Sequence, residues 1–265
     1  MKYIEKILSR LVVNQTSLSK KCLRNAVGIS VGLVVWELVY WATEGRGFAH
    51  FWEVGLRIAH LTIDFKFWIS IFATAGLALG GLAGGVMLAV LIGVPLAVYR
   101  RLERELRWVL LFARAIPSVA LLPLLMASMG SRGALVSIFV VWLVAIKMVF
   151  FVIRGVRDVD RPLAEQAKLL QLSPTAQIVF LRIPSASSVV LMGTRLSVGL
   201  AYGSVVLAGL LAGTPGLGRD ISFAAFSGET ESVLSYTVIS GYIGVALFTL
   251  LRKIEHRLVF WRNVA

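Results

Sequence analysis

Six apolar stretches, each close to the length of a helix that crosses a lipid bilayer, dominate the sequence. They lie near residues 26–43, 68–98, 106–128, 133–153, 189–212 and 233–251. Lipid cannot satisfy free backbone N–H and C=O groups, so about 20 consecutive apolar residues indicate a spanning helix. A mean hydropathy of +0.83 agrees with this interpretation. We therefore predict an all-α, polytopic transmembrane helix bundle with about six spans.

Lys and Arg are distributed unevenly between these stretches. Of the 27 Lys and Arg residues, 18 lie in the segment before the first stretch, in 99–105, in 154–188 and in the tail after the last stretch. The loops on the opposite side carry five: Arg46, Arg57, Lys66, Arg132 and Arg219. Because cytoplasmic loops carry the excess of basic residues, both termini are expected in the cytoplasm and the protein in a bacterial inner membrane, as a multi-pass protein. The basic residues form no continuous face, so we expect no nucleic-acid partner.

The predicted organisation has three parts. Residues 1–25 form a basic cytoplasmic segment, residues 26–252 form the transmembrane domain with a cytoplasmic loop over 154–188, and residues 253–265 form a cytoplasmic tail. The segment 44–67 is amphipathic in places, and either a helix along the outer interface or a plain loop would fit it. In the second stretch Gly76, Gly80 and Gly84, with Gly81 and Gly85 beside them, repeat at a spacing that lets another helix approach closely.

Several chemical functions find no support in the sequence. Cys22 is the only cysteine, and no Cys/His set has the spacing of metal ligands. No glycine-rich run is followed by Lys-Ser or Lys-Thr, so the chain has no phosphate-binding loop and is not expected to hydrolyse ATP. The three histidines lie outside the spans without a matching acid and nucleophile, which disfavours a membrane enzyme. A secondary transporter or channel would need inverted repeats or buried acidic residues, and neither is evident.

The longest predicted cytoplasmic loop, 154–188, is predicted to contain two short helices. Asp160 can cap the first, with Pro162 in its opening turn, and Ser173 followed by Pro174 is a typical start for the second. Leu163, Ala167 and Leu170 recur at helical spacing, flanked by Glu165 and Lys168. They predict an exposed apolar ridge that requires a protein partner.

This loop resembles the Glu-Ala-Ala loop of ABC importer permeases. The resemblance rests on Glu165-Gln166-Ala167, six residues after Val159-Asp160, and on Ile183-Pro184. It extends over roughly residues 68–261. Arg114 to Leu124, with Pro117 and Pro123, is similar to the third-helix signature of the branch that imports nitrate, sulfonates, taurine and bicarbonate. The motifs Gly193-Thr194-Arg195-Leu196, Gly199-Leu200-Ala201-Tyr202 and Gly216-Leu217-Gly218 are similar to that branch's fifth helix and following loop.

The resemblance implies a type I ABC importer permease fold in which a short coupling helix docks on an ATPase. The residues expected at that contact are Asp160, Leu163, Glu165, Ala167, Leu170, Gln171, Leu172 and Ser173. The implied partners are a second copy of the permease, two ATPase subunits that carry ATP and Mg, an extracytoplasmic binding protein that docks on outer loops such as 213–232, and the lipid bilayer. The chain itself is expected to bind no cofactor.

The chain departs from the family pattern at four places. Gln166 and Gln171 stand where the family usually has alanine and glycine, which predicts a less bendable loop. Ala208-Gly209 replaces the branch's Ala-Glu, and Ala145-Ile146-Lys147 replaces its Phe-Phe-Pro. The last two lie along the implied pathway and leave the substrate open: a small oxyanion is the branch's usual cargo, and a pyrimidine or flavin vitamin precursor is the alternative.

Four ionisable residues lie within or near the ends of spans. They are Arg114, Lys147, Arg195 and Glu37. A charge at mid-bilayer costs about 2.5 to 3.5 kcal/mol on insertion scales, so it should face protein or water. For Arg114 and Arg195, lining an anion pathway with Pro117 and Gly209, snorkelling to the cytoplasmic face and pairing between helices all remain open. For Lys147 the open alternatives are the pathway and snorkelling. Glu37 is expected to have a structural or interfacial role.

Overall fold

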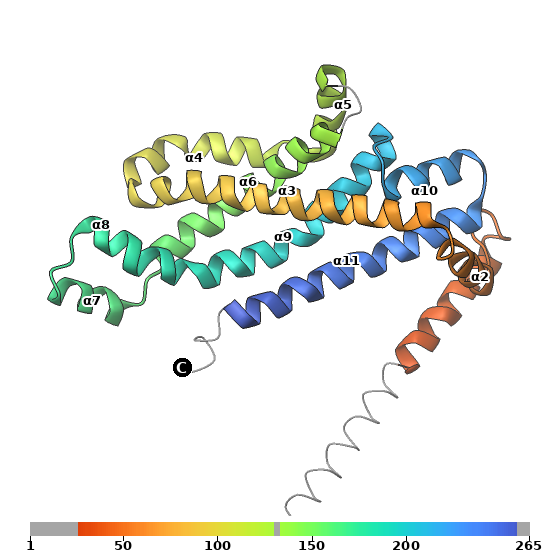
Figure 1. The fold of residues 1–265 in the computed structure, drawn as a ribbon, viewed down its shortest axis with the longest axis horizontal. Coiled ribbons are helices and arrows are strands. Elements are labelled where there is room, and N and C mark those ends of the chain that lie inside the picture. Colours follow the sequence, from red (N-terminus) through yellow and green to blue (C-terminus); the bar gives the residue numbers. More distant parts are fainter. Residues whose placement is uncertain (1–25, 130–132, 259–265) are drawn as a thin grey trace, which may run out of the picture.

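The computed structural model describes residues 26–129 and 133–258, and within them every regular element is a helix (Figure 1). In chain order these are Ala26–Ala42, α2 (Phe51–Leu61), α3 (Phe65–Val98), α4 (Arg100–Ala115), α5 (Ser118–Met129), α6 (Gly133–Arg157), α7 (Arg161–Leu169), α8 (Pro174–Gln177), the π-helical turn η1 (Ile178–Arg182), α9 (Ile183–Ala212), α10 (Leu217–Phe226) and α11 (Thr230–Leu258). The all-α prediction is confirmed. The predicted basic segment 1–25 lies outside the described residues.

Within residues 26–129 and 133–258, fewer helices have the length and apolarity of a span than the six stretches predicted. Four helices in the described part of the chain are long and apolar enough to cross a membrane, namely α3, α6, the continuous helix Pro174–Ala212 and α11. The predicted third span is instead two helices, α4 and α5, which meet at 86° and would make a fifth span only if counted together. Pro117 causes the break, because it has no N–H to continue α4 and restricts Ile116, whose ψ is 123°.

The predicted first span is a helix that projects away from the bundle (Figure 1). Its described part, Ala26–Ala42, would reach about 25 Å at 1.5 Å per residue, short of a 30 Å hydrocarbon layer. Two side chains hold its end: Trp36 Nε1 donates to the carbonyl of Ala49 at 2.9 Å, and a Glu37 oxygen lies 3.0 Å from His50 Nδ1. The structural role expected of Glu37 agrees with these contacts.

The core of the bundle forms where α3 and α9 pack along α6. Three glycines of α3 make the close approach to α6: a Cβ on Gly81, Gly85 or Gly93 would lie within 2.8 Å of a valine side chain. By contrast, Gly76 and Gly80 have open space around them. A Cβ on Gly84 would also lie 2.9 Å from Val141, so the expected repeat contacts α6 at Gly84, while the closest approach is made by the glycines one residue further along.

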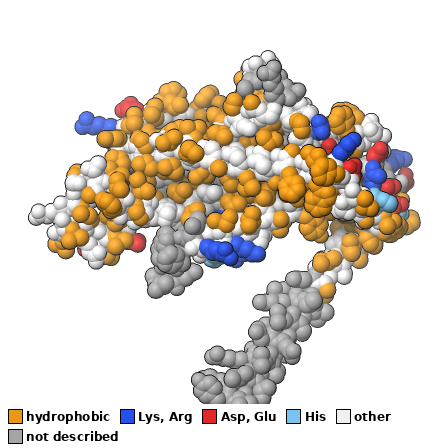
Figure 2. All heavy atoms as spheres, in the orientation of Figure 1, with side chains coloured by type: hydrophobic (Ala, Val, Ile, Leu, Met, Phe, Trp, Pro, Cys, Tyr) orange, Lys and Arg blue, Asp and Glu red, His pale blue; other side chains and the backbone are white. Residues whose placement is uncertain are grey.

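The connecting segments lie at two opposite ends of the long helices. Figure 1 shows α7 and α8 at one end, which we call the α7 end, and α2 and α10 at the other, the α10 end. The segment 44–67, for which the sequence allowed a helix or a plain loop, contains the helix α2. Figure 2 shows hydrophobic side chains covering the middle of the bundle and charged ones gathering at the α10 end. This distribution matches helices α3, α6 and α9 crossing an apolar layer.

Candidate functional site

The loop between α6 and α9 folds into the two expected short helices. The carbonyl of Asp160 accepts a hydrogen bond from Ala164 N at 3.0 Å, so Asp160 stands at the start of α7. The Ser173 hydroxyl accepts from Ala176 N at 3.3 Å and caps α8, with Pro174 in the first turn. Both predicted starts are confirmed. The second helix, α8, runs on through η1 into α9 as one continuous helix, and α7 is joined to it through the turn over residues 170–173.

The exposed apolar surface at the α7 end is partly the predicted one. Leu163 and Leu170 are 41% and 72% exposed, as the stripe predicts. Ala167 is buried at 5%, so it belongs to the packed side of α7 and the ridge prediction was wrong at this position. Two further apolar side chains, Leu169 and Phe180, are more exposed than Leu163. The sequence could have indicated both residues, because large exposed apolar side chains in a basic loop mark a contact with another protein. Glu165 is exposed beside them, and the side chain of Lys168 lies outside the described atoms.

Gln171 makes the turn between α7 and α8 in place of glycine. Its φ is +49°, in the left-handed region. Leu172 N donates to the carbonyl of Ala167 at 3.1 Å, the six-to-one bond that ends a helix at a left-handed residue. The Leu172 carbonyl in turn accepts from Gln177 Nε2 at 2.9 Å. The turn therefore forms without glycine, at the cost of placing a side chain in a strained conformation.

Gln171→Gly is expected to stabilise the end of α7 by about 1 kcal/mol, because glycine adopts positive φ without a Cβ clash. Hydrogen exchange of the Leu170 and Leu172 amides checks this, with slower exchange expected in the variant. The control is Gln166→Gly, an exposed position inside the same helix, where glycine should cost about 1 kcal/mol and speed exchange. Faster exchange in both variants would show that Gln171 is not strained.

A buried carboxylate ties three helices together at the base of this loop. Glu103 of α4 lies 2.7 Å from Arg107 and 3.4 Å from Arg157 at the end of α6. Arg157 also donates to the carbonyls of Ala97 and Leu96 at the end of α3, at 3.0 and 2.9 Å. Burial alone would raise the pKa of Glu103, but the hydrogen bonds and charges of the two arginines outweigh it and lower the pKa below its ordinary value. The start of the loop is thus fixed to α3 and α4.

A second group of predicted residues gathers at the bend between α4 and α5. Arg114 and Lys147 both line a cavity of about 190 Å³, with Ile116, Ser118 and Trp142 among its other walls. At about 30 Å³ per water, it has room for one small ion with some water. Neither cation forms an ion pair with another described residue. The Arg114 guanidinium lies 5.4 Å from the centre of the Phe150 ring. The cavity is therefore positive and has no acidic side chain in its lining.

The remaining predicted pathway residues have other surroundings. Arg195 pairs with Glu255 of α11 at 3.0 Å and lies 5.8 Å from the Phe248 ring centre, so helix pairing, one of the three open alternatives, describes it. Gly209 packs against α10, where an added Cβ would lie 2.9 Å from Gly218 Cα. Pro117 is exposed at the α4–α5 bend next to the cavity. The structure brings together Arg114, Lys147 and the bend at Pro117, and it separates Arg195 and Gly209 from them.

Comparison with known sequences finds a family match over most of the chain. Residues 85–260 match the model of the binding-protein-dependent transport system inner membrane component family. A probable ABC transporter permease of Brucella abortus is 29% identical over 244 residues, covering 91% of this chain and 96% of its own. The putative aliphatic sulfonates transport permease SsuC of Bacillus subtilis is 31% identical, covering 70% and 67%. The nitrate import permease NrtB of Leptolyngbya laminosa is 25% identical, covering 84% and 75%.

Solved structures show the same fold. A chain of the MetNI methionine ABC transporter in an inward-facing conformation superposes with a TM-score of 0.64 at 17% identity, covering 77% of this chain and 98% of its own. An amino acid ABC transporter structure gives a TM-score of 0.63 at 14% identity. At these identities the likeness concerns the fold, and it supports the expected importer permease architecture.

Proposed function

Since the chain belongs to the binding-protein-dependent inner membrane components, and within them to the nitrate, sulfonate and taurine branch of type I ABC importer permeases, we propose that it carries a small oxyanion inward. The candidates are a sulfonate, taurine, nitrate or bicarbonate. The observation that carries the proposal is the cavity in which Arg114 and Lys147 meet without a described carboxylate partner. Two cations facing one small space favour an anion.

We propose that the pathway lies between two copies of the chain in a bacterial inner membrane. The cavity sits at the α4–α5 bend, and Arg114, which lines it, and Pro117, between the lining residues Ile116 and Ser118, are exposed in the single chain. A second copy would cover them and enclose the ion. Each copy would rock between inward-open and outward-open states, as bundles of this kind do in alternating access.

The α7 end would face the cytoplasm and carry the ATPase subunits. Its exposed apolar side chains, Leu163, Leu169, Leu170 and Phe180, would enter a cleft of the ATPase, which binds ATP and Mg. The excess of Lys and Arg in 99–105 and 154–188 supports this orientation. The extracytoplasmic binding protein would dock at the α10 end, on α10 and the start of α11.

Reconstitution of the chain with an ATPase and a binding protein encoded beside it tests the proposal. We expect ATP-dependent uptake of at least one of nitrate, taurine, ethanesulfonate or bicarbonate into proteoliposomes. Uptake confined to a pyrimidine or a flavin would overturn the oxyanion assignment. Uptake that continues without the ATPase subunits would instead indicate a secondary transporter.

A further inference from the structure

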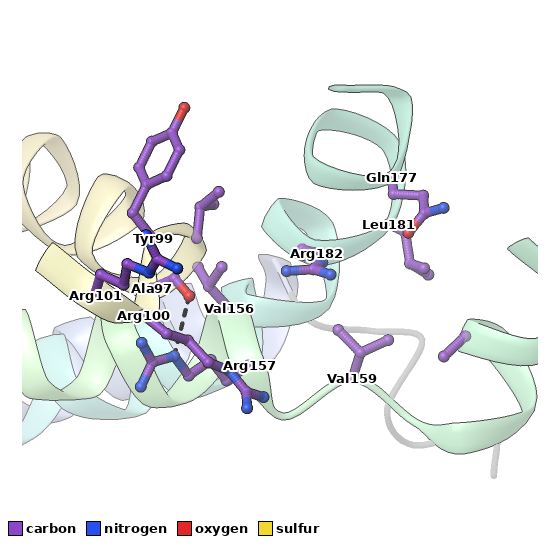
Figure 3. Close-up of a pocket in the computed structure, with 12 residues that line it drawn as sticks. Ala97, Tyr99, Arg100, Arg101, Val156, Arg157, Val159, Gln177, Leu181 and Arg182 are labelled. Atoms are coloured by element: carbon purple, nitrogen blue, oxygen red, sulfur yellow. Dashed lines mark hydrogen bonds between the residues drawn. The ribbon is translucent and has the colours of Figure 1, made fainter. Parts of the chain in front are cut away.

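The largest cavity described at the α7 end is lined by four arginines and is separate from the proposed pathway. It has a volume of about 570 Å³ and lies among the end of α3, the start of α4, the end of α6 and η1 (Figure 3). Its basic residues are Arg100, Arg101, Arg157 and Arg182, and no Asp or Glu is among its lining residues. Such a concentration of guanidinium groups around one space favours an anionic ligand.

Three of the four arginines are available to a ligand. Arg157 is committed to the carbonyls of Leu96 and Ala97, and its bond to Ala97 is drawn as a dashed line in Figure 3. Arg100, Arg101 and Arg182 form no ion pair with any residue in the described ranges. Figure 3 shows Arg101 and Arg182 coming from helices on different sides of the space. A ligand between them would be held from both sides.

The surroundings of the cavity suit an amphiphile better than a free ion. The apolar run of α3 ends at Val98, and Tyr99 follows it, 65% exposed. Aromatic side chains concentrate at this depth, where hydrocarbon meets water. Val98, Val156 and Leu181 give the cavity apolar walls beside its arginines. A charged headgroup and the first carbons of its chains would each find a matching surface.

We propose that this cavity binds the phosphate of an anionic phospholipid such as phosphatidylglycerol. Basic pockets between spanning helices at the cytoplasmic surface are suited to such headgroups. Arg100, Arg101 and Arg182 hold the phosphate oxygens, and the acyl chains leave along α3. Val159 and Ala164, at the start of the coupling loop, complete the wall, so a bound lipid contacts α7 directly. The proposal depends on α3 and α6 crossing the membrane and not on which substrate is carried.

Native mass spectrometry of the full chain in detergent tests this proposal. Wild-type protein is expected to retain phosphatidylglycerol in preference to phosphatidylcholine. The double variant Arg101→Gln/Arg182→Gln should bind phosphatidylglycerol at least tenfold more weakly, given about 1 kcal/mol for each basic residue near an anionic headgroup. The control, Arg252→Gln/Lys253→Gln, removes the same charge from exposed positions on α11 and should bind as the wild type does.

Three results would overturn it. Equal retention by the arginine double variant and the wild type would show that the cavity is not the site. An equal loss of phosphatidylglycerol binding in the α11 control would show that the loss reflects the protein's net charge and not this cavity. Displacement of the lipid by millimolar inorganic phosphate or by the ATPase subunit would assign the cavity to a soluble anion or to the protein interface. A normal melting temperature of each variant ensures that the comparison is between folded proteins.

Discussion

Deleting residues 163–171 is expected to abolish ATP-driven uptake while leaving the membrane-spanning helices folded. Most of the segment lies outside the core: Leu163, Leu169 and Leu170 are exposed, and Ala167 is the only one of its described side chains that is buried. The large apolar side chains of α7 therefore stabilise the isolated chain little. Their burial against an ATPase subunit would supply the affinity that joins the two proteins.

Point substitutions test the same contact with the ATPase without shortening the loop. In Leu169→Asp/Leu170→Asp, each carboxylate would be buried in the contact, and capture of the ATPase should weaken by about 30-fold or more, the effect of losing about 2 kcal/mol or more at an interface. Glu165→Ala tests the neighbouring charge and is likewise expected to reduce coupling. Co-purification and stimulated ATP hydrolysis are the measurements.

The matched control for the leucine variant is Phe226→Asp at the α10 end. Phe226 is as exposed as Leu169 but lies at the opposite end of the bundle. This variant should capture the ATPase normally, whatever it does to the binding protein. If the leucine variant captured the ATPase as well as this control and supported the same hydrolysis, α7 would not be the coupling helix.

The long spanning helices were predictable because their apolar runs have no other stable arrangement in lipid. The bend between α4 and α5 was not, although Pro117 marked its place. A proline in an apolar run can kink a helix or end it, and packing decides which. Here the chain leaves the helix at Ile116, and the resulting 86° angle opens the space beside Lys147. The cavity beside Lys147 therefore depends on tertiary packing, which the sequence pattern alone does not determine.

The partner of Arg195 was also missed, for a different reason. The apolar run of the last span ends near residue 251, so Glu255 was assigned to the tail. In the structure α11 continues to Leu258, and its last turns lie beside α9. A helix can continue past its apolar stretch when its charged side chains form ion pairs with another helix. Hydropathy does not predict such pairs. The same limit applies to Ala167, because spacing predicts which residues share a face but not which face is covered.

Lys147→Met is expected to lower the kcat/KM of uptake by about 10- to 100-fold without loss of stability. A hydrogen bond to a charged group contributes about 1.5 to 3 kcal/mol, and methionine keeps the length of the side chain without its charge. Because Lys147 has no ion-pair partner among the described residues, its removal strands no carboxylate there. Arg114→Met should act in the same direction, since both side chains line one cavity.

Arg195→Met provides the contrast that separates a pathway role from a structural one. Its side chain is 27% exposed and its partner, Glu255, is 10% exposed, so the substitution leaves a buried carboxylate unpaired. Breaking such a pair costs about 3 to 5 kcal/mol, and the melting temperature should fall. The two variants are therefore expected to differ. Lys147→Met should slow uptake of whichever of nitrate, taurine, ethanesulfonate or bicarbonate the wild type carries, at normal stability, and Arg195→Met should lose stability. An unchanged uptake profile in Lys147→Met would remove this lysine from the pathway, and the same result in Arg114→Met would remove the physical reason for an anionic substrate.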